Sequence, residues 1–131
     1  MSEKKMILSI DDDQLMLKNL TAILSPAYDL RIAKCAADAL NLLDTLKPDL
    51  ILLDIEMPDI SGFEFFRGIR KNPKFMKTPV IVITGHSESS ILERAEKLGA
   101  SSVITKPVDK DDLFQKIKHA FENPPKGIFM L

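Results

Sequence analysis

The feature of this sequence that most limits its fold is the alternation of short apolar runs with longer stretches of helical periodicity. The runs are Met6–Ile10, Leu30–Ala33, Leu50–Leu53, Val80–Ile83 and Val103–Ile104. Three of them, MILSI, LILL and VIVI, are nearly continuous in apolar character. Strands covered on both faces have this composition, and the strands of parallel sheets are covered on both faces. The runs therefore predict the strands of a parallel sheet.

The stretches between the runs carry apolar side chains at the spacing of an amphipathic helix. Boundary signals agree, because Ser61 with Glu64 indicates a capping box, Gly99 a helix end and Asp109 a helix start. The alternation predicts an α/β fold with a doubly wound, five-stranded parallel sheet and right-handed crossovers. The apolar stripes are Met16, Leu20, Ile23 and Leu24; Ala36, Leu40, Leu43 and Leu46; Phe63, Phe66 and Ile69; Ile91, Ala95 and Leu98; and Leu113, Ile117, Ala120 and Phe121.

Length and charge narrow the class of protein. The 131 residues suit one domain with one core, and a net charge of −1 gives no reason to expect direct binding to nucleic acid or to a membrane. The first apolar run is too short for a signal peptide or a membrane span, so we expect a cytoplasmic protein. Pro124 and Pro125 end the last helix. We therefore expect a domain over residues 1–121, and a tail or the start of a linker over residues 122–131.

Polar residues follow the predicted strands at the points where these strands end. Asp11, Asp12 and Asp13 follow the first strand, Asp54 ends the third, Thr84 ends the fourth, and Lys106 follows the fifth. The carboxyl ends of parallel strands lie at one edge of the sheet, where open α/β sheets bind their ligands. We therefore expect these carboxylates, the hydroxyl and the ammonium group to converge on one site.

The convergence has a chemical logic. Clustered carboxylates repel one another unless a cation lies among them, and hard oxygen ligands suit Mg²⁺, or Mn²⁺ as an alternative. An aspartate such as Asp54 can accept a phosphoryl group. The ammonium group of Lys106 and the hydroxyl of Thr84 would then help a metal ion to neutralise the phosphoryl oxygens. Taken alone each residue has a simpler interpretation, and the aspartates at 11–13 fit a helix N-cap about equally well.

Four motifs together resemble the receiver domain of response regulators in two-component phosphorelays, over about Lys5 to Phe121. They are the acidic segment Ile10-Asp11-Asp12-Asp13, the loop Leu53-Asp54-Ile55-Glu56-Met57-Pro58 followed by Gly62, the segment Ile83-Thr84-Gly85, and the pair Lys106-Pro107. The resemblance implies a flavodoxin-like fold with the strand order 2-1-3-4-5. Val103 stands where many members of the family carry an aromatic residue that moves together with the threonine.

The resemblance also implies roles for individual residues. Asp54 would be the phosphoacceptor. Mg²⁺ would be held by Asp12 directly, by Asp11 mostly through water, and by Asp54 and the backbone carbonyl of Glu56. Thr84 and Lys106 would contact the phosphoryl oxygens, and the peptide bond between Lys106 and Pro107 would be cis.

Three further residues are expected to modulate the site. Gly85 is the small residue that follows the strand-four hydroxyl, and Glu56 and His86 would stand at the mouth of the pocket. There they would set the rate at which water removes the phosphoryl group, and His86 could pair with Glu56. The alternative, that both are solvated loop residues without effect, stays open.

The predicted function is two-component signal transduction by a phosphoacceptor domain that is not an enzyme in its own right. Its partners would be a histidine kinase or a histidine phosphotransfer protein, and a downstream effector protein or linked domain. Partners, or a second copy in a homodimer, would bind the face formed by residues 91–98, 103–105 and 113–121. One alternative is an aspartate-based, Mg²⁺-dependent phosphohydrolase, because Asp11 and Asp13 have the required spacing. A flavodoxin-like electron carrier is the other, although acidic residues disfavour phosphate binding at that turn.

Overall fold

A computed structural model of the chain describes residues 3–127; residues 1–2 and 128–131 lie outside the described part, and with them most of the apolar end of the predicted tail. Strands and helices alternate along the whole of the described chain. In order they are β1 (Met6–Ile10), α1 (Gln14–Leu24), β2 (Asp29–Ala33), α2 (Ala36–Leu43), β3 (Leu50–Asp54), α3 (Gly62–Lys71), β4 (Val80–Thr84), α4 (Ser89–Lys97), β5 (Ser102–Thr105) and α5 (Lys110–Glu122).

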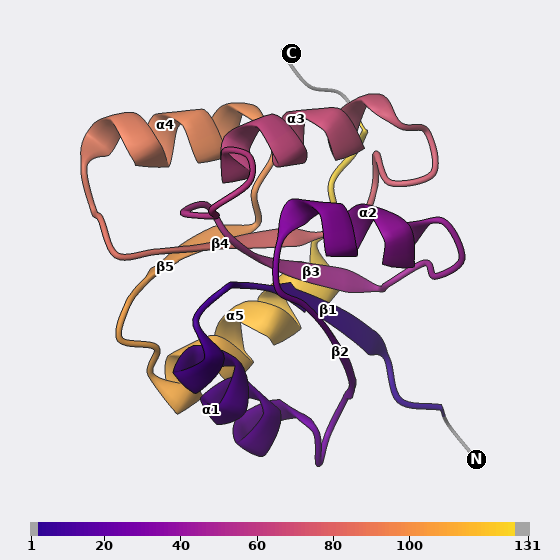
Figure 1. Cartoon of the computed structure of the whole chain (residues 1–131), viewed down its shortest axis with the longest axis vertical. Helices are drawn as coiled ribbons and strands as arrows, with labels where there is room; N and C mark the ends of the chain where they lie inside the picture. Colours follow the sequence, from indigo (N-terminus) through magenta and orange to yellow (C-terminus); the bar gives the residue numbers. More distant parts are fainter. Residues whose placement is uncertain (1–2, 128–131) are drawn as a thin grey trace.

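The strands form one parallel sheet in the order β2-β1-β3-β4-β5. The register places Leu53 beside Ile10, Asp54 beside Ile83 and Thr84 beside Thr105. Helices α1 and α5 cover one face of the sheet, and α2, α3 and α4 cover the other (Figure 1). Both the predicted fold class and the predicted strand order are confirmed.

The core divides between the two faces because successive side chains of a strand point in opposite directions. In β3, Ile51 and Leu53 pack on the side of α2, α3 and α4, where Phe66 is fully buried. Leu50 and Leu52 pack on the side of α1 and α5. Every residue of β3 and β4 is buried. This two-sided burial is the reason why the apolar runs are nearly continuous.

Most predicted helix boundaries hold. Asp109 caps α5 by accepting a hydrogen bond from the backbone N–H of Asp112, and Gly99 follows α4 with a φ of 75°. Ser61 caps α3 but accepts from the N–H of Phe63, one residue earlier than the predicted capping box requires.

The predicted stripe of α2 is wrong in two places. The helix ends at Leu43, so Leu46 lies beyond it, and Leu40 is 51% exposed. The buried face of α2 consists of Ala36, Ala39 and Leu43 instead.

Arg70 is a buried cation whose burial the sequence does not predict. Its side chain is fully buried, and its guanidinium donates to the backbone carbonyls of Leu98, Phe75, Thr78 and Gly99 at 2.6–3.2 Å. Burial lowers its pKa to about 10, so the group stays charged at neutral pH. Arg70 thereby ties the end of α3 to the loop before β4 and to the end of α4.

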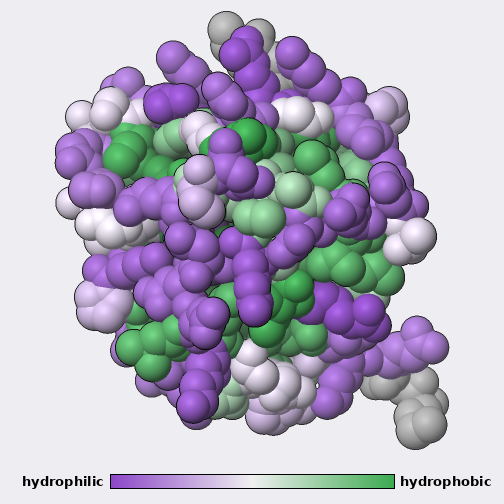
Figure 2. Space-filling view, in the orientation of Figure 1, coloured by the Kyte–Doolittle hydropathy of each residue, from purple (hydrophilic) through white to green (hydrophobic). Residues whose placement is uncertain are grey.

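Figure 2 shows polar side chains over most of one face of the molecule, with apolar side chains in separate patches between them. Among the described residues, none of the helices is both long enough and apolar enough to cross a membrane.

Candidate functional site

Three carboxylates meet at the carboxyl edge of the sheet. Asp11 and Asp12 follow β1, Asp54 ends β3, and one oxygen from each lies within 4.8 Å of the others. Asp11 and Asp54 are buried, with 1% and 2% of their surface exposed, whereas Asp12 is exposed. The convergence that the strand ends predicted is therefore observed.

The three consecutive aspartates, Asp11 to Asp13, have two different structural roles. Asp13 is the N-cap of α1, and its Oδ1 accepts from the N–H of Leu15 at 3.0 Å and of Met16 at 3.3 Å. The N–H of Asp13 donates to Asp11 Oδ1 at 2.9 Å and so orients the buried carboxylate. The helix-cap interpretation is correct for Asp13, while Asp11 and Asp12 face the acidic cluster.

The cluster fits a hard divalent cation. Within residues 3–127, Asp11 Oδ2 is buried and has no hydrogen-bond partner. Lys106 Nζ lies 3.5 Å from it, at the distance of an ion pair. Leaving a buried carboxylate oxygen without a donor is costly, and a metal ion among the three carboxylates would remove that cost.

Asp54 is held by groups on either side. Its Oδ1 accepts from the N–H of Glu56 at 2.9 Å, and its Oδ2 lies 3.3 Å from Lys106 Nζ. The pKa of Asp54 is raised to about 7, mainly by burial and also by the neighbouring Asp11, while the N–H of Glu56 and the charge of Lys106 oppose the shift. Burial alone would lower the pKa of Lys106, but the charges of Asp54 and Asp11 outweigh it and the pKa is raised. A protonated lysine therefore faces a carboxyl group that a bound cation would help to ionise.

Thr84 and Glu56 form the other side of the site. The buried Thr84 hydroxyl donates to Glu56 Oε1 at 3.1 Å and accepts from the N–H of His86 at 3.0 Å. Gly85 N–H also donates to Glu56 Oε1 at 3.1 Å. This N–H, followed by the Thr84 hydroxyl and the nearby His86, lowers the pKa of Glu56 against the opposing effect of burial. His86 Nε2 lies 3.6 Å from Glu56 Oε1, so the predicted pairing is observed.

The loop from Ile55 to Ser61 connects β3 to α3 beside the acidic cluster. Gly62 closes it, because its N–H donates to the Ile55 carbonyl at 3.0 Å and its Cα faces the Ile55 backbone without room for a Cβ. On the opposite side, the bond between Lys106 and Pro107 is cis, and the N–H of Lys106 donates to the Thr84 carbonyl at 2.8 Å. Loop closure and the β4–β5 contact thus bring the side chains together.

Val103 in β5 and Asp59 in the β3–α3 loop lie on elements that border the site. Val103 is partly buried and packs against the core on the side of α2, α3 and α4. Asp59 lies in the β3–α3 loop, where the sequence predicts no role for it; its carboxylate accepts hydrogen bonds from the first turn of α2. No local signal reveals that contact, because 23 residues separate Asp59 from Ala36.

Comparison with known proteins gives a consistent result. The family model described as "Response regulator receiver domain" matches residues 7–118. The transcriptional regulatory protein GlrR of Escherichia coli K12 is 37% identical over 117 residues, which cover 88% of this chain and 26% of GlrR. Protein PilH of Pseudomonas aeruginosa is 32% identical over 112 residues, which cover 85% of this chain and 93% of PilH.

Among solved structures, a CheY-like response regulator receiver domain protein from Methanospirillum hungatei JF-1 has a TM-score of 0.84 and 30% identity, covering 92% of this chain and 95% of that chain. The chain spans about a quarter of the length of GlrR, but nearly the whole of PilH. These matches do not favour the phosphohydrolase or the electron carrier. Because the family model covers most of the sequence and the fold agrees, the chain belongs to the response regulator receiver domain family of two-component signalling proteins.

Proposed function

We propose that this receiver domain accepts a phosphoryl group on Asp54 in a Mg²⁺-dependent step, and that the modification changes the binding of a downstream partner or linked domain. The observation that carries the proposal is the buried Asp11 Oδ2, which has no hydrogen-bond donor among residues 3–127, beside Asp54 and Lys106. In this site one ammonium group faces two buried carboxylates, so negative charge is in excess. A divalent cation and the Lys106 ammonium group would together balance it.

The proposed ligands of the ion are Asp12, Asp11, Asp54 and the backbone carbonyl of Glu56, with Mn²⁺ as an alternative to Mg²⁺. When bound, the ion supplies positive charge for the phosphoryl oxygens. Asp54 attacks phosphorus through a carboxylate oxygen, the bond from phosphorus to the donor's histidine nitrogen breaks, and the electron pair leaves with the imidazole. Lys106, already beside Asp54 Oδ2 at 3.3 Å, holds a phosphoryl oxygen in the product.

The Thr84 hydroxyl must give up its present acceptor before it can donate to a phosphoryl oxygen. It donates to Glu56 Oε1, so a phosphoryl oxygen on Asp54 must replace that carboxylate as acceptor. A more highly charged acceptor favours the exchange. The exchange moves Thr84 at the end of β4 and leaves the N–H of Gly85 as the remaining donor of the pair to Glu56 Oε1. We propose that this is how the charge on Asp54 reaches β4, α4 and β5.

The donor is proposed to be the phosphohistidine of a histidine kinase or of a histidine phosphotransfer protein. The domain supplies its own catalytic groups for phosphorylation and dephosphorylation but turns over no separate substrate, so we class it as a signalling domain. Four further points stay predictions: a cytoplasmic location, no direct contact with nucleic acid, a homodimer on the face of α4, β5 and α5, and a domain boundary at residue 121.

Intact-mass measurement after incubation with a small acyl phosphate tests the proposal. The parent protein should gain one phosphoryl group with Mg²⁺ and none in excess chelator, and Asp54→Ala should gain none. Asp38→Ala, which removes an exposed carboxylate from the first turn of α2, is the matched control and should be labelled like the parent. Labelling of Asp54→Ala, or labelling in chelator, would refute the proposal.

A further inference from the structure

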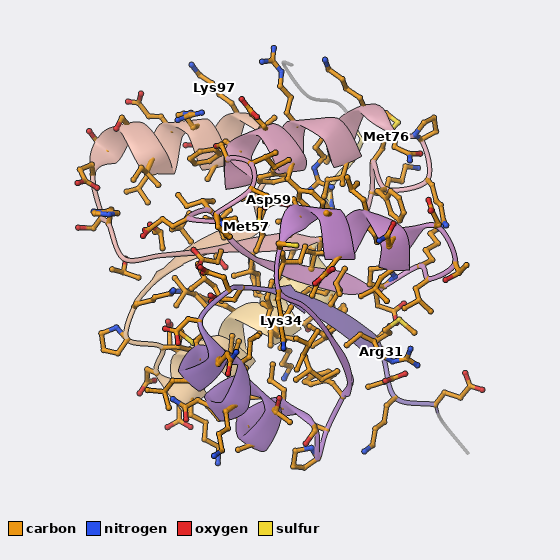
Figure 3. All side chains as sticks on the ribbon, in the orientation of Figure 1. Arg31, Lys34, Met57, Asp59, Met76 and Lys97 are labelled. Carbon is orange, nitrogen blue, oxygen red and sulfur yellow. The ribbon has the colours of Figure 1, made fainter. Side chains whose placement is uncertain are left out.

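Helix α2 is capped by a residue that lies outside it. Its N-cap position is occupied by Cys35, which has extended backbone angles (φ −161°, ψ 173°) and makes no side-chain capping hydrogen bond. The N–H of Ala36 donates instead to Asp59 Oδ1 at 3.2 Å, and the N–H of Ala37 donates to Asp59 Oδ2 at 3.0 Å. Figure 3 shows Asp59 beside the start of α2. By contrast, α1, α3 and α5 are capped by the side chains of their own N-cap residues.

The contact is favourable for electrostatic reasons. The first N–H groups of a helix have no partner within the helix and form the positive end of its dipole, so a carboxylate is a suitable acceptor. The N–H of Ala37 lowers the pKa of Asp59 most; desolvation opposes the shift, and the N–H groups of Ala36, Ile60 and Asp59 add to the lowering. The carboxylate therefore stays ionised and holds both donors at neutral pH.

Asp59 lies in the loop that carries the acceptor and one proposed metal ligand. The two ends of this loop are fixed by its own backbone: the N–H of Glu56 donates to Asp54, and the N–H of Gly62 donates to the Ile55 carbonyl. The middle of the loop is more exposed to solvent; Asp59 itself is exposed. Two hydrogen bonds from one carboxylate then join this middle segment to the first turn of α2.

We propose that Asp59 is a positioning residue for the phosphorylation site: it clamps the β3–α3 loop to α2 and so holds the Glu56 backbone where its carbonyl can reach the metal ion. This inference rests on the proposed function, because the metal-binding role of the Glu56 carbonyl is part of that proposal. Asp59 lies three positions after Glu56, and its carboxylate bonds to the first turn of α2 and not to a proposed metal ligand.

A simpler role must be separated from this one, because Asp59 could act only as a helix cap. The chain offers a way to distinguish them. Cys35 already has the extended backbone of an N-cap residue, so Cys35→Ser can supply a local cap to α2 without any link to the loop. In the double variant Cys35→Ser/Asp59→Ala, the helix is capped again but the loop stays unclamped.

The experiment measures three quantities for the full chain: the thermal midpoint without metal, the Kd for Mg²⁺ by calorimetry, and the rate of labelling by an acyl phosphate. Asp59→Ala should lower the midpoint and weaken Mg²⁺ binding about tenfold, the lower end of the range found for residues that orient metal ligands. Cys35→Ser/Asp59→Ala should recover the midpoint but not the Kd or the rate. Asp109→Ala uncaps α5 away from the loop and should lower the midpoint with an unchanged Kd.

Two outcomes would overturn the inference while leaving the proposed function intact: a parent-like Kd for Asp59→Ala, or recovery of the Kd together with the midpoint in the double variant. A parent protein that binds no Mg²⁺ and takes no label would overturn the proposed function and the inference with it. If Asp59→Ala does not fold, Asp59→Asn keeps one acceptor oxygen and is measured in its place. Asp59→Asn should give a Kd between those of the parent and of an unclamped loop. If its amide exchange at residues 55–61 is faster but its Kd equals that of the parent, the clamp is refuted.

Discussion

The hydroxyl of Thr84 donates a hydrogen bond to the carboxylate of Glu56 at 3.1 Å, although 28 residues separate them in the sequence. Glu56 is thereby placed over the site from the side of β4, where His86 lies 3.6 Å from the same carboxylate oxygen. On the proposed function, we expect a water molecule that attacks a phosphoryl group on Asp54 to approach past these side chains. Glu56 would then act on hydrolysis by orienting that water or by repelling it.

Replacing Glu56 or His86 by alanine should change the dephosphorylation rate several-fold, about 1 kcal/mol in barrier, without abolishing phosphorylation of Asp54. Glu56→Ala removes a carboxylate that would orient the attacking water by accepting its hydrogen, which slows hydrolysis, and it removes a negative charge that would repel the nucleophile, which speeds hydrolysis. The measurement is the decay of the phosphoprotein after removal of the donor, at fixed Mg²⁺. Glu93→Ala, an exposed acid on α4, is the control. Decay of all three variants at the rate of the parent would show that Glu56 and His86 have no effect.

The metal-free protein should lose stability as the pH rises towards 7, because of Asp54. Burial raises the pKa of this carboxyl from 3.8 to about 7 in the folded state. The folded protein then binds a proton that the unfolded chain has released, so the stabilisation is complete below about pH 4 and is lost as pH rises through 7. Asp54→Asn should therefore be more stable than the parent at about pH 8 by roughly 2–4 kcal/mol, and about equal at pH 4.

Urea unfolding in chelator at both pH values measures that difference. Saturating Mg²⁺ should reduce it at the higher pH, because the ion stabilises the ionised parent and has a weaker site in the asparagine variant. A stability difference between Asp54→Asn and the parent that does not vary with pH would contradict the raised pKa.

Two glycines of α3 should respond to alanine in opposite ways. A Cβ on Gly62 would lie 2.9 Å from the Ile55 carbonyl carbon and closer still to its Cα, so Gly62→Ala should destabilise the fold by at least about 2 kcal/mol. Gly68 has open space at the same atom, and alanine favours the helix, so Gly68→Ala should stabilise it by about 1 kcal/mol. Thermal unfolding of the two variants checks the pair. Equal changes in stability for the two variants would contradict the close contact between Gly62 and the Ile55 backbone.

Phosphorylation should change the face formed by α4, β5 and α5. Thr84 and Lys106 stand at the ends of β4 and β5, so charge on Asp54 is felt first by the elements that follow these strands. Amide exchange with and without beryllofluoride, which mimics the phosphoryl group, should show altered protection in α4, β5 and α5 as a shift between two conformers. Asp54→Ala is the control that should show no change. A response confined to α2 and α3 would contradict the prediction.

The sequence by itself was sufficient for the elements and for the edge at which the site lies. Continuous apolar runs indicated strands covered on both faces, and β3 and β4 are buried throughout. Polar residues at strand ends indicated a shared edge, and Asp11, Asp12 and Asp54 meet there. Such features depend on periodicity and on the common direction of parallel strands, which are readable without coordinates. The strand order and the residue roles came from the resemblance to receiver domains, not from spacing.

Tertiary structure decided the contacts between segments that are far apart in the chain. It separated Asp13, which caps α1, from the buried Asp11, and it turned Leu40 outward from α2. It brought Asp59 to α2 across 23 residues, and Arg70 to the carbonyl of Leu98 across 28. Hydrogen bonds of this kind depend on which strands are neighbours and on how closely each helix packs, because a carboxylate or guanidinium group finds its donors or acceptors only after the layers have assembled. Local patterns contain no record of those distances.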